Sequence, residues 1–473
     1  MDNKRRTYGQ HLTPIDIFKK YVLPKIKNDI YKYKWIDLFA GEGNLILPIL
    51  EIIPKKERVD FFKNHIFLFD IQKEMVDKCI RNAINYGIPE KIAEKNIKTR
   101  DTLEVYPKSI LNDNLPVYHI TNPPYLYIGY IKKHKETQKH LKYFEGENEG
   151  YQDLYQIALM NDLRNKIDNM IYIIPSNFLF GNSGTNKIRD DFLKYYYIKK
   201  GIIFEKEIFE HTGVNVAILF FKRKSQPKDE IQFFEGLKIN HIIKKRNYNL
   251  NPKNHYRAGS EFDEFVNNYK ANTPLKIKYY LTLEEVENNK GDNELMAIDA
   301  NNYKGSSYKK LKISVNDKYY NKIKSNNLWI RTVDTGNKDG RAGIYLINKS
   351  FKTDGILVTK AKYRTHPIQI FIEPTLSRDK QIILMDYFNM ILEYFRDKTD
   401  SEFLTTYKYS NSEYTRKYLG LSQVKKLIET FPLLNLNECQ KNEFINIIKC
   451  KNTNKLLEFV KSLKNNEGIE KWL

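Results

Sequence analysis

The feature that most constrains the fold is a unit that recurs through the first half of the chain. A short apolar run ends at a polar residue and is followed by a stretch with helical periodicity, as in residues 72–86. The apolar runs are residues 34–39, 65–69, 97–99, 117–121 and 170–174. Short apolar strands that alternate with helices predict a parallel sheet with helices on both faces.

This alternation ends near residue 224. Residues 201–209 and 214–221 predict a strand pair that adds an antiparallel edge to the sheet, and the charged, proline-containing connector 222–228 follows. The remainder mixes short strands (355–360, 368–372) with helices (380–396, 421–429, 443–450, 455–463) and shows no clear βα alternation. We therefore expect an α/β domain at residues 1–224 and a mixed α+β domain at residues 225–473.

The charge balance favours a polyanionic partner. The 473 residues include 79 Lys and Arg against 58 Asp and Glu, a formal net charge of +21. Each Lys or Arg that meets a nucleic-acid phosphate releases a counterion, so such a surplus favours nucleic-acid binding. The alternative is the generally basic composition of a protein from an AT-rich genome, which the charge alone does not separate from DNA binding.

The sequence argues against a secreted, membrane-spanning or metal-binding protein. Residues 1–10 are charged and lack the apolar core of a signal peptide. The longest apolar runs are far shorter than the roughly 20 residues that span a bilayer. The cysteines, at positions 79, 439 and 450, have no metal-ligand spacing. We expect a soluble, cytoplasmic monomer without a metal.

Three aspartates end successive predicted strands and indicate a nucleoside-binding crevice. Asp37 closes the first strand before the glycine turn Gly41-Glu42-Gly43, Asp70 closes the second, and Asp101 follows the third. Neighbouring aspartates are about one βαβ unit apart, so all three should meet at one edge of the sheet. Asp70 is placed to accept both hydroxyls of a ribose, and Asp101 to accept from an adenine amine. The alternative for each is a cap on the following helix.

The crevice is predicted to hold S-adenosyl-L-methionine. The chain has no G-x-G-x-x-G and no Lys-Ser/Thr after the glycine turn, so a phosphate-cradling loop is not supported. A nucleoside cofactor without a pyrophosphate fits better, and S-adenosyl-L-methionine is the common one.

The tetrapeptide Asn122-Pro123-Pro124-Tyr125 after the fourth strand suits transfer to a planar amine. Its two prolines fix the backbone and remove two N–H donors. The Asn122 amide oxygen and the Pro123 carbonyl remain as acceptors, which can take both N–H bonds of an aryl amine and orient its lone pair. Tyr125 is placed to stack on the target ring. The alternative is a rigid surface turn.

With these motifs in order, residues 7–224 resemble the gamma-class DNA adenine-N6 methyltransferases of bacterial restriction–modification systems. The match to their D-x-F-x-G-x-G motif runs from Asp37 to Gly43, and Asn122–Tyr125 matches their catalytic motif. The resemblance assigns cofactor contacts to Tyr8, Thr13, Pro14, Asp37, Phe39, Ala40, Gly41, Gly43, Asp70, Ile71, Asp101, Thr102 and Asn122. It also makes Phe209 a candidate for a second aromatic ring that stacks on the target base. The alternative is that Phe209 is an ordinary phenylalanine of the hydrophobic core.

The resemblance implies a Rossmann-like S-adenosylmethionine-dependent methyltransferase fold with a C-terminal target-recognition domain. The implied reaction is methylation of the N6 amine of a flipped adenine in double-stranded DNA. The order of motifs, with the cofactor motifs first and a large variable part last, is that of the gamma class. The chain begins at the cofactor motif, so no built-in nuclease is expected; a cognate restriction endonuclease would be a separate protein.

Basic and aromatic clusters in the second half are candidates for DNA contact. Such side chains suit contacts to phosphates and to guanine edges. The candidates are Lys360, Lys362, Arg364, Arg331, Arg341 and Arg416. For any single cluster, the alternative is an ordinary solvated surface.

Three other functions remain open from the sequence. The same tetrapeptide occurs in protein-glutamine methyltransferases. Those enzymes are similar in the cofactor half, but their chains are shorter and have no large region after it. An RNA adenine methyltransferase is a second alternative, and the size of the second half disfavours it. A catalytically silent DNA-specificity protein is the third, and the intact tetrapeptide and aspartates argue against it.

Overall fold

The computed structural model describes most of the chain as two compact units. It covers residues 9, 12–111, 115–206, 208–209, 215–240, 242–335, 340–360, 366–408 and 416–470, with the backbone alone at 183, 406–408, 416 and 465–470. Unit 1 extends to Ala258, and unit 2 begins at Gly259.

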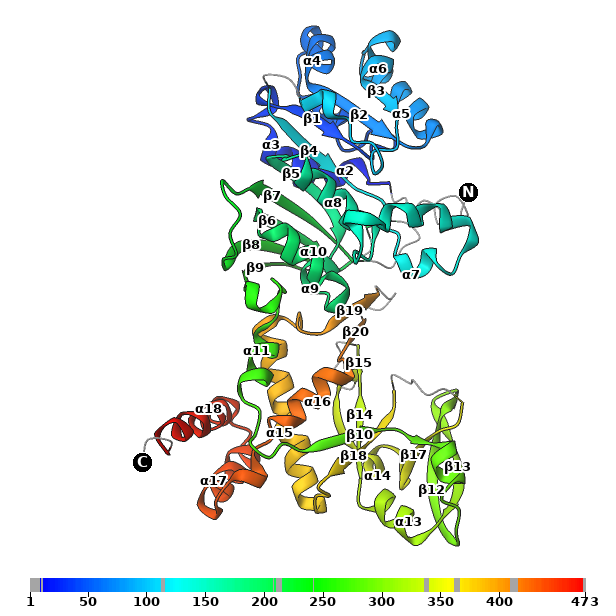
Figure 1. The fold of residues 1–473 in the computed structure, drawn as a ribbon, viewed down its shortest axis with the longest axis vertical. Helices are drawn as coiled ribbons and strands as arrows, with labels where there is room; N and C mark the ends of the chain where they lie inside the picture. The colour runs from blue at the N-terminus through cyan, green and yellow to red at the C-terminus, as the bar shows by residue number, and fades with distance from the viewer. Residues whose placement is uncertain are drawn as a thin grey trace. The chain divides into compact units, whose positions relative to one another are not determined.

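One nine-stranded sheet is the framework of unit 1 (Figure 1). Its strands are β1 (Lys34–Asp37), β2 (Ile66–Asp70), β3 (Ile97–Thr99), β4 (Val117–Thr121), β5 (Asn169–Pro175), β6 (Tyr196–Phe204), β7 (Val216–Arg223), β8 (Gln232–Ile239) and β9 (Ile243–Leu250). They lie in the order β3-β2-β1-β4-β5-β7-β6-β8-β9. The first five are parallel, and β7 is antiparallel to both of its neighbours. The sheet is therefore mixed, and its order reverses between β1 and β4.

The five predicted strands and the helix at 72–86 are confirmed, with ends shifted by one or two residues. Parallel strands between two layers of helices are buried on both faces, so their sequences are continuously apolar. All of β1 and all but the first residue of β5 are buried in this way. Helix α5 (Lys73–Asn85) instead buries one face, with Met75, Val76, Cys79 and Ala83.

The other helices of unit 1 are mostly short. The α-helices are α2 (Ile15–Ile17), α3 (Leu23–Ile26), α4 (Arg58–His65), α6 (Glu90–Asn96), α7 (Ile128–Ile131), α8 (Leu154–Arg164), α9 (Asn177–Phe180) and α10 (Ser183–Leu193). One element, η1 (Phe18–Val22), is a π-helix. The 3₁₀ helices are η2 (Ile30–Lys32), η3 (Leu47–Glu51), η4 (Lys55–Glu57), η5 (Lys108–Leu111), η6 (Lys135–Phe144), η7 (Gly146–Asn148) and η8 (Pro252–Asn254).

Unit 1 continues past residue 224, where the sequence suggested a domain boundary. β8 pairs in parallel with β6, and β9 pairs antiparallel with β8, so residues 232–250 extend the same sheet. The β6–β7 pair is antiparallel as expected, but it lies inside the sheet and β9 forms the edge. Residues 225–228 are an exposed turn between strands. Such a turn has the same charged, proline-containing composition as a linker between domains. For this reason the sequence alone predicts a domain boundary at a turn that lies within one sheet.

The described part of unit 2 is a mixture of small sheets and helices. Its sheets have the orders β10-β18-β14-β16, β11-β17-β12-β13 and β15-β20-β19. The strands are β10 (Lys276–Tyr279), β11 (Leu281–Thr282), β12 (Asn293–Lys304), β13 (Ser307–Val315), β14 (Leu328–Arg331), β15 (Val333–Asp334), β16 (Gly343–Leu346), β17 (Gly355–Val358), β18 (Ile368–Glu373), β19 (Thr405–Lys408) and β20 (Arg416–Tyr418). The helices are α11 (Glu261–Asn268), α12 (Leu283–Glu287), α13 (Asp317–Lys324), α14 (Ile347–Phe351), α15 (Arg378–Thr399), α16 (Leu421–Glu429), η10 (Leu433–Asn435), α17 (Glu438–Lys449) and α18 (Thr453–Glu470).

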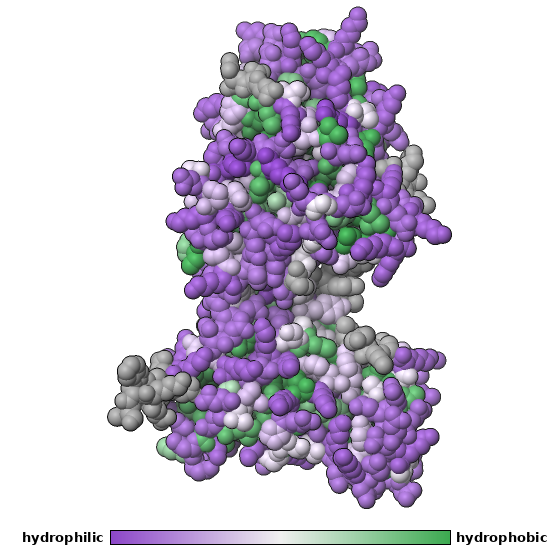
Figure 2. All heavy atoms as spheres, in the orientation of Figure 1, coloured by the Kyte–Doolittle hydropathy of each residue, from purple (hydrophilic) through white to green (hydrophobic). Residues whose placement is uncertain are grey.

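The surface of each unit is largely hydrophilic in the view of Figure 2. Among the described helices, none is long and apolar enough to cross a membrane. Within the same residues, no group of three or more His, Cys, Asp or Glu side chains is arranged to hold a metal ion.

Candidate cofactor and catalytic site

The carboxyl ends of β1, β2 and β4 bring the predicted polar residues to one pocket. β1 pairs with β2 on one side and with β4 on the other, so the ends of these strands meet at the switch point of the sheet. The empty space of the pocket is about 800 Å³, with the open solvent at its mouth included. It is lined by Leu12, Thr13, Asp37, Phe39, Ala40, Gly41, Glu42, Asn44, Leu45, Asp70, Ile71, Gln72, Arg100, Asp101, Thr102, Leu103, Asn122, Pro124, His140, Tyr143 and Leu154.

Asp37 is buried at the end of β1, where it stabilises the turn that follows. Its Oδ1 accepts hydrogen bonds from Thr121 Oγ1 at 2.6 Å and from the Phe39 N–H at 3.0 Å. Burial raises the pKa of this carboxyl to about 6, and the two hydrogen bonds oppose that rise. Asp37 therefore fixes the backbone of Phe39, which lines the pocket.

Asp70 holds the glycine turn from the neighbouring strand. Its Oδ2 accepts from the Gly41 N–H at 2.9 Å, and its Oδ1 accepts from the Gln72 N–H at 2.8 Å. Burial raises the pKa of the Asp70 carboxyl. Gly41 has a φ of +53°, a conformation that favours glycine. Each carboxylate oxygen can accept a second hydrogen bond, so Asp70 can position the turn and still accept from a ribose.

Two pocket residues, His140 and Tyr143, come from η6 and belong to none of the predicted motifs. Both are buried, and their rings stack with centroids 5.9 Å apart. The Tyr143 hydroxyl donates to Asp101 Oδ2 at 2.5 Å, and Lys142 Nζ lies 3.8 Å from the same oxygen. The sequence carries no signal for these residues, because the position of η6 depends on packing against distant segments.

Thr13 connects the glycine turn to Asn122. Its carbonyl accepts from Asn44 Nδ2 at 3.0 Å, and its Oγ1 accepts from Asn122 Nδ2 at 3.1 Å. The amide nitrogen of Asn122 is thereby directed toward Thr13. The predicted N-terminal motif and the predicted catalytic residue are thus in direct contact.

The Tyr125 ring is buried, with its hydroxyl turned toward protein acceptors. The hydroxyl lies 2.5 Å from Asn122 Oδ1 and 2.7 Å from the Ile173 carbonyl oxygen. The Tyr125 N–H donates to the Gly9 carbonyl at 3.0 Å. Gly9 has a φ of +63°, and a Cβ there would collide with the Tyr125 carbonyl. To stack on a base, the Tyr125 ring would have to leave these contacts.

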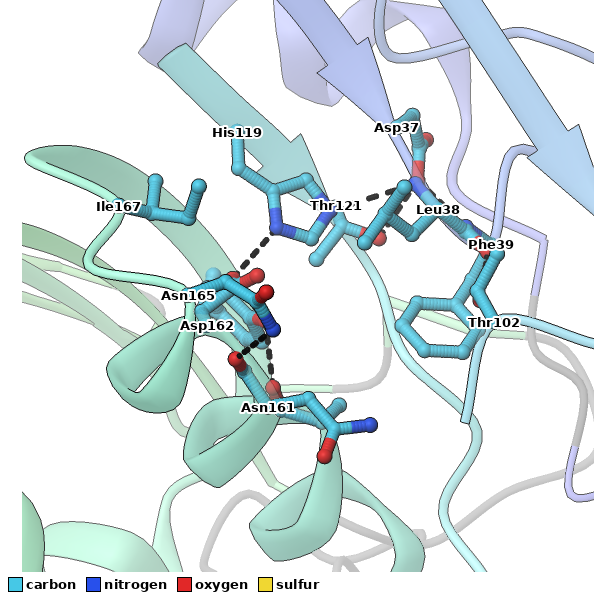
Figure 3. A network of polar contacts seen from close by, with 12 residues as sticks. Asp37, Leu38, Phe39, Thr102, His119, Thr121, Asn161, Asp162, Asn165 and Ile167 are labelled. Carbon is cyan, nitrogen blue, oxygen red and sulfur yellow. Dashed lines mark hydrogen bonds and ion pairs between the residues drawn. The ribbon is translucent and has the colours of Figure 1, made fainter. Parts of the chain in front are cut away.

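Behind the pocket, His119 and Asp162 hold the backbone of Leu38 (Figure 3). The Leu38 N–H donates to His119 Nε2 at 3.2 Å, and His119 Nδ1 lies 2.6 Å from Asp162 Oδ2. Thr102 Oγ1 donates to the Leu38 carbonyl at 2.8 Å. Because Nε2 accepts, the ring proton is on Nδ1 and is donated to Asp162. The peptide groups between Asp37 and Phe39 are therefore fixed on both sides.

Most of the predicted cofactor residues lie together, and a few do not. Thr13, Asp37, Phe39, Ala40, Gly41, Asp70, Ile71, Asp101, Thr102 and Asn122 line the pocket, as does Pro124. Gly43 does not line it: its φ is +85°, and a Cβ there would meet Leu47 and Cys79 in the core. Neither do Pro14, Pro123, Tyr125 and Phe209, and the Phe209 side chain is buried. Tyr8 lies outside the described residues.

The DNA-binding candidates of unit 2 are only partly described. Lys360 is exposed. Arg331 Nε donates to the Val333 carbonyl at 3.2 Å, and the Arg341 guanidinium pairs with Glu393, so both have partners within the unit. Lys362 and Arg364 lie outside the described residues, and Arg416 is described in its backbone alone, within β20. DNA contact by these six residues stays a prediction.

The residues of the pocket fit S-adenosyl-L-methionine better than a phosphate-bearing ligand. Apolar side chains line the pocket together with three carboxylates at the ends of strands. Arg100 is the one Lys or Arg among the described residues that line it, and its Nε already donates to the Val105 carbonyl. A pyrophosphate would meet carboxylates there, whereas ribose hydroxyls, an adenine amine and a sulfonium suit them.

Residues 1–295 match the protein family described as N-6 DNA Methylase. The methylase subunit of the type I restriction enzyme MpnII from Mycoplasma pneumoniae is 21% identical over 338 residues, which are 64% of this chain and 57% of that protein. The chain thus matches a little over half of the length of this relative.

Solved structures with a similar fold include the type IIL restriction-modification enzyme MmeI in complex with DNA. It has a TM-score of 0.52 and 13% identity, and the match covers 95% of this chain and 71% of that one. A modification subunit of a putative type I restriction enzyme from Vibrio vulnificus YJ016 has a TM-score of 0.37 and 17% identity, over 55% of this chain and 52% of that one. Because MmeI is only 13% identical to this chain, its match indicates a similar fold and nothing about the activity of this chain.

Proposed function

Because the chain belongs to the N-6 DNA methylase family, we propose that it is an S-adenosyl-L-methionine-dependent, adenine-specific DNA methyltransferase. Its substrate is double-stranded DNA, and its product carries a methyl group on the N6 amine of one adenine in a specific site. The modification protects that site from a cognate restriction endonuclease, which acts as a separate protein.

One observation carries this proposal: Asn122 lines the same pocket as Asp70 and Asp101, at the switch point of the sheet. Asp70 and Asp101 are the residues proposed to hold the ribose and the adenine of the cofactor. S-adenosyl-L-methionine supplies an electrophilic methyl group on a sulfonium. Asn122, the proposed hydrogen-bond acceptor for the target amine, thus lines the same pocket as the two carboxylates that are proposed to hold the cofactor.

Asn122 and Pro123 position the target amine. Asn122 Oδ1 accepts one N–H of adenine N6 and the Pro123 carbonyl accepts the other, which directs the nitrogen lone pair out of conjugation with the ring. Thr13 fixes the Asn122 amide by its hydrogen bond to Nδ2. No strong base is required before attack, because the proton leaves after the methyl group has been bonded. Tyr125 stacks on the base once its ring has turned from its buried position.

Unit 2 is proposed as the target-recognition domain. Its basic residues Arg331, Arg341, Lys360, Lys362, Arg364 and Arg416 are proposed to contact DNA. The large positive charge of the chain supports a polyanionic partner.

The test is methyl transfer from labelled S-adenosyl-L-methionine to unmethylated genomic DNA, with RNA and protein as parallel acceptors. We expect label in DNA as N6-methyladenine. Asn122→Ala should lower the transfer rate about 100-fold or more, as does loss of one preorganised hydrogen-bond partner in other enzymes, while cofactor binding remains. The exposed Asn64 gives a matched control, Asn64→Ala, that should be fully active. Label in RNA or protein alone, or an active Asn122→Ala variant, would contradict the proposal.

A further inference from the structure

The segment that follows the catalytic tetrapeptide carries a concentrated positive charge. Between residues 126 and 142 there are five lysines and one acidic residue, Glu136. Lys132, Lys133, Lys135 and Lys139 are exposed. None of the DNA-binding residues predicted from the sequence lies in this segment.

We infer that residues 127–139 form a DNA-contact surface of unit 1, here called the 127–139 surface. Lys132, Lys133 and Lys135 contact phosphates next to the target adenine, and the Tyr127 ring stacks on a base beside it. The inference rests on the proposed function, because it takes DNA as the substrate of the pocket.

The 127–139 surface carries three lysines whose charge no acidic side chain of the described residues neutralises. Among the described residues, Lys132, Lys133 and Lys135 have no ion-pair partner. Glu136 is the one acidic residue between positions 126 and 142. Its Oε1 lies 3.6 Å from His134 Nδ1. Lys142, by contrast, pairs with Glu104 at 2.5 Å. Three lysines within four positions of the sequence, with no carboxylate partner among the described residues, attract a polyanion.

Tyr127 is an exposed aromatic side chain on a fixed backbone. Its side chain is 54% exposed. Asp153 Oδ1 accepts from the Leu126 N–H at 2.9 Å, and the Gln152 carbonyl accepts from the Ile128 N–H at 2.9 Å. The ring packs so closely over Gly129 that a Cβ there would collide with it. A preorganised ring of this kind loses little entropy when a base stacks on it.

The 127–139 surface lies within reach of the target base. Tyr127 comes five positions after Asn122, so their Cα atoms lie at most about 18 Å apart. Duplex DNA carries one negative charge per about 1.7 Å of its axis. About ten phosphates therefore lie within that distance along the axis. At the other end of the segment, η6 carries both Lys135 and His140, and His140 lines the cofactor pocket. Lys132 and Lys133 lie in the turn between α7 and η6.

The first test compares Lys132→Ala/Lys133→Ala/Lys135→Ala with the matched triple variant Lys55→Ala/Lys56→Ala/Lys63→Ala, whose lysines are also exposed. The probe is a fluorescein-labelled 30-bp duplex of arbitrary sequence, followed by anisotropy across a salt series. We expect weaker binding for the first variant alone, with the slope of log affinity against log salt reduced by about one for each phosphate that the variant no longer binds. Equal slopes and affinities for both triple variants would overturn the inference.

The second test concerns Tyr127. Tyr127→Ala should weaken duplex binding about tenfold, within the range that one base–aromatic stack contributes, and Tyr127→Phe should bind as the wild type does. Affinity for S-adenosyl-L-methionine should be unchanged in both, which excludes misfolding. Wild-type DNA affinity in Tyr127→Ala would remove the ring from the proposed surface.

Failure of this inference differs from failure of the proposed function. If the wild type methylates DNA but the lysine variant binds it normally, the 127–139 surface is wrong and the function stands. If DNA binding depends on these lysines but no methyl transfer occurs, the surface stands and the function is wrong.

Discussion

His119 is completely buried, and each of its ring nitrogens has one partner. Nε2 accepts from Leu38 in the turn that forms the pocket, and Nδ1 donates to Asp162. The Asp162 carboxylate also accepts from the Tyr172 and Tyr106 hydroxyls, at 2.5 Å and 3.0 Å. His119 is therefore a positioning residue that connects the cofactor turn to α8 through a fully hydrogen-bonded network.

We expect His119→Ala to weaken S-adenosyl-L-methionine binding while DNA binding persists. The change leaves the Leu38 N–H without its acceptor and removes one of the three hydrogen bonds that the Asp162 carboxylate accepts. Each lost hydrogen bond should lower the free energy of unfolding by about 1–3 kcal/mol. Calorimetric titration with the cofactor and urea unfolding would measure the two effects.

The control for His119 is His65→Ala. His65 packs on Phe61 and bonds the Tyr33 carbonyl, away from the pocket. This variant should lose stability without losing cofactor affinity. Equal cofactor affinity in both variants would refute the positioning role of His119.

At the scale of elements, η6 connects two functions. Its buried residues His140 and Tyr143 line the pocket, and its exposed lysines belong to the 127–139 surface or flank it. The contact between Tyr143 and Asp101 is a side-chain hydrogen bond that joins η6 to the end of β3. Removing it should loosen one wall of the pocket while the sheet stays intact.

We expect Tyr143→Phe to raise the dissociation constant of S-adenosyl-L-methionine about tenfold. A hydrogen bond to a carboxylate contributes about 1.5–3 kcal/mol. Titration calorimetry measures this directly. Tyr31→Phe is the matched control, because Tyr31 donates to the Glu57 carboxylate at 3.0 Å on an exposed surface. The same weakening in both variants, or in neither, would contradict the assigned role.

At the scale of the whole molecule, the two units have separate hydrophobic cores. One continuous cluster surrounds the sheet of unit 1, and the clusters of unit 2 begin only after Gly259. The pocket lies entirely in unit 1. Ligand binding should therefore stabilise one unit and not the other.

We expect two unfolding transitions, of which S-adenosyl-L-methionine raises one. At a ligand concentration of 100 times the dissociation constant the stabilisation is about 2.7 kcal/mol, or about 5–10 °C for a unit of this size. Differential scanning calorimetry with and without the cofactor measures it, and Asn122→Ala should keep the shift. A single transition, or an equal shift of both, would show that the units unfold together.

Particular residues show how far the sequence could be read. Asp37, Asp70, Asp101 and Asn122 were placed at strand ends by short-range patterns, and the structure brings all four to one pocket. The edge strands 232–250 were missed, because an exposed turn inside a domain has the composition of a linker. The sequence predicts that Tyr125 faces its target base, but its hydroxyl donates to the Ile173 carbonyl, 48 positions away in the sequence.

The sequence by itself determined the parallel part of the sheet and the pocket's strand-end residues. Their signal is local: each apolar run stops at a polar residue, and parallel strands put their carboxyl ends at one edge. Only the tertiary structure decided that η6 forms one wall of the cofactor pocket, how His119 and Asp162 hold the backbone of Leu38, and where the Tyr125 ring lies. Those contacts join residues that are far apart in the sequence, and no local pattern encodes such pairing. Leu38 and His119, for example, are 81 positions apart.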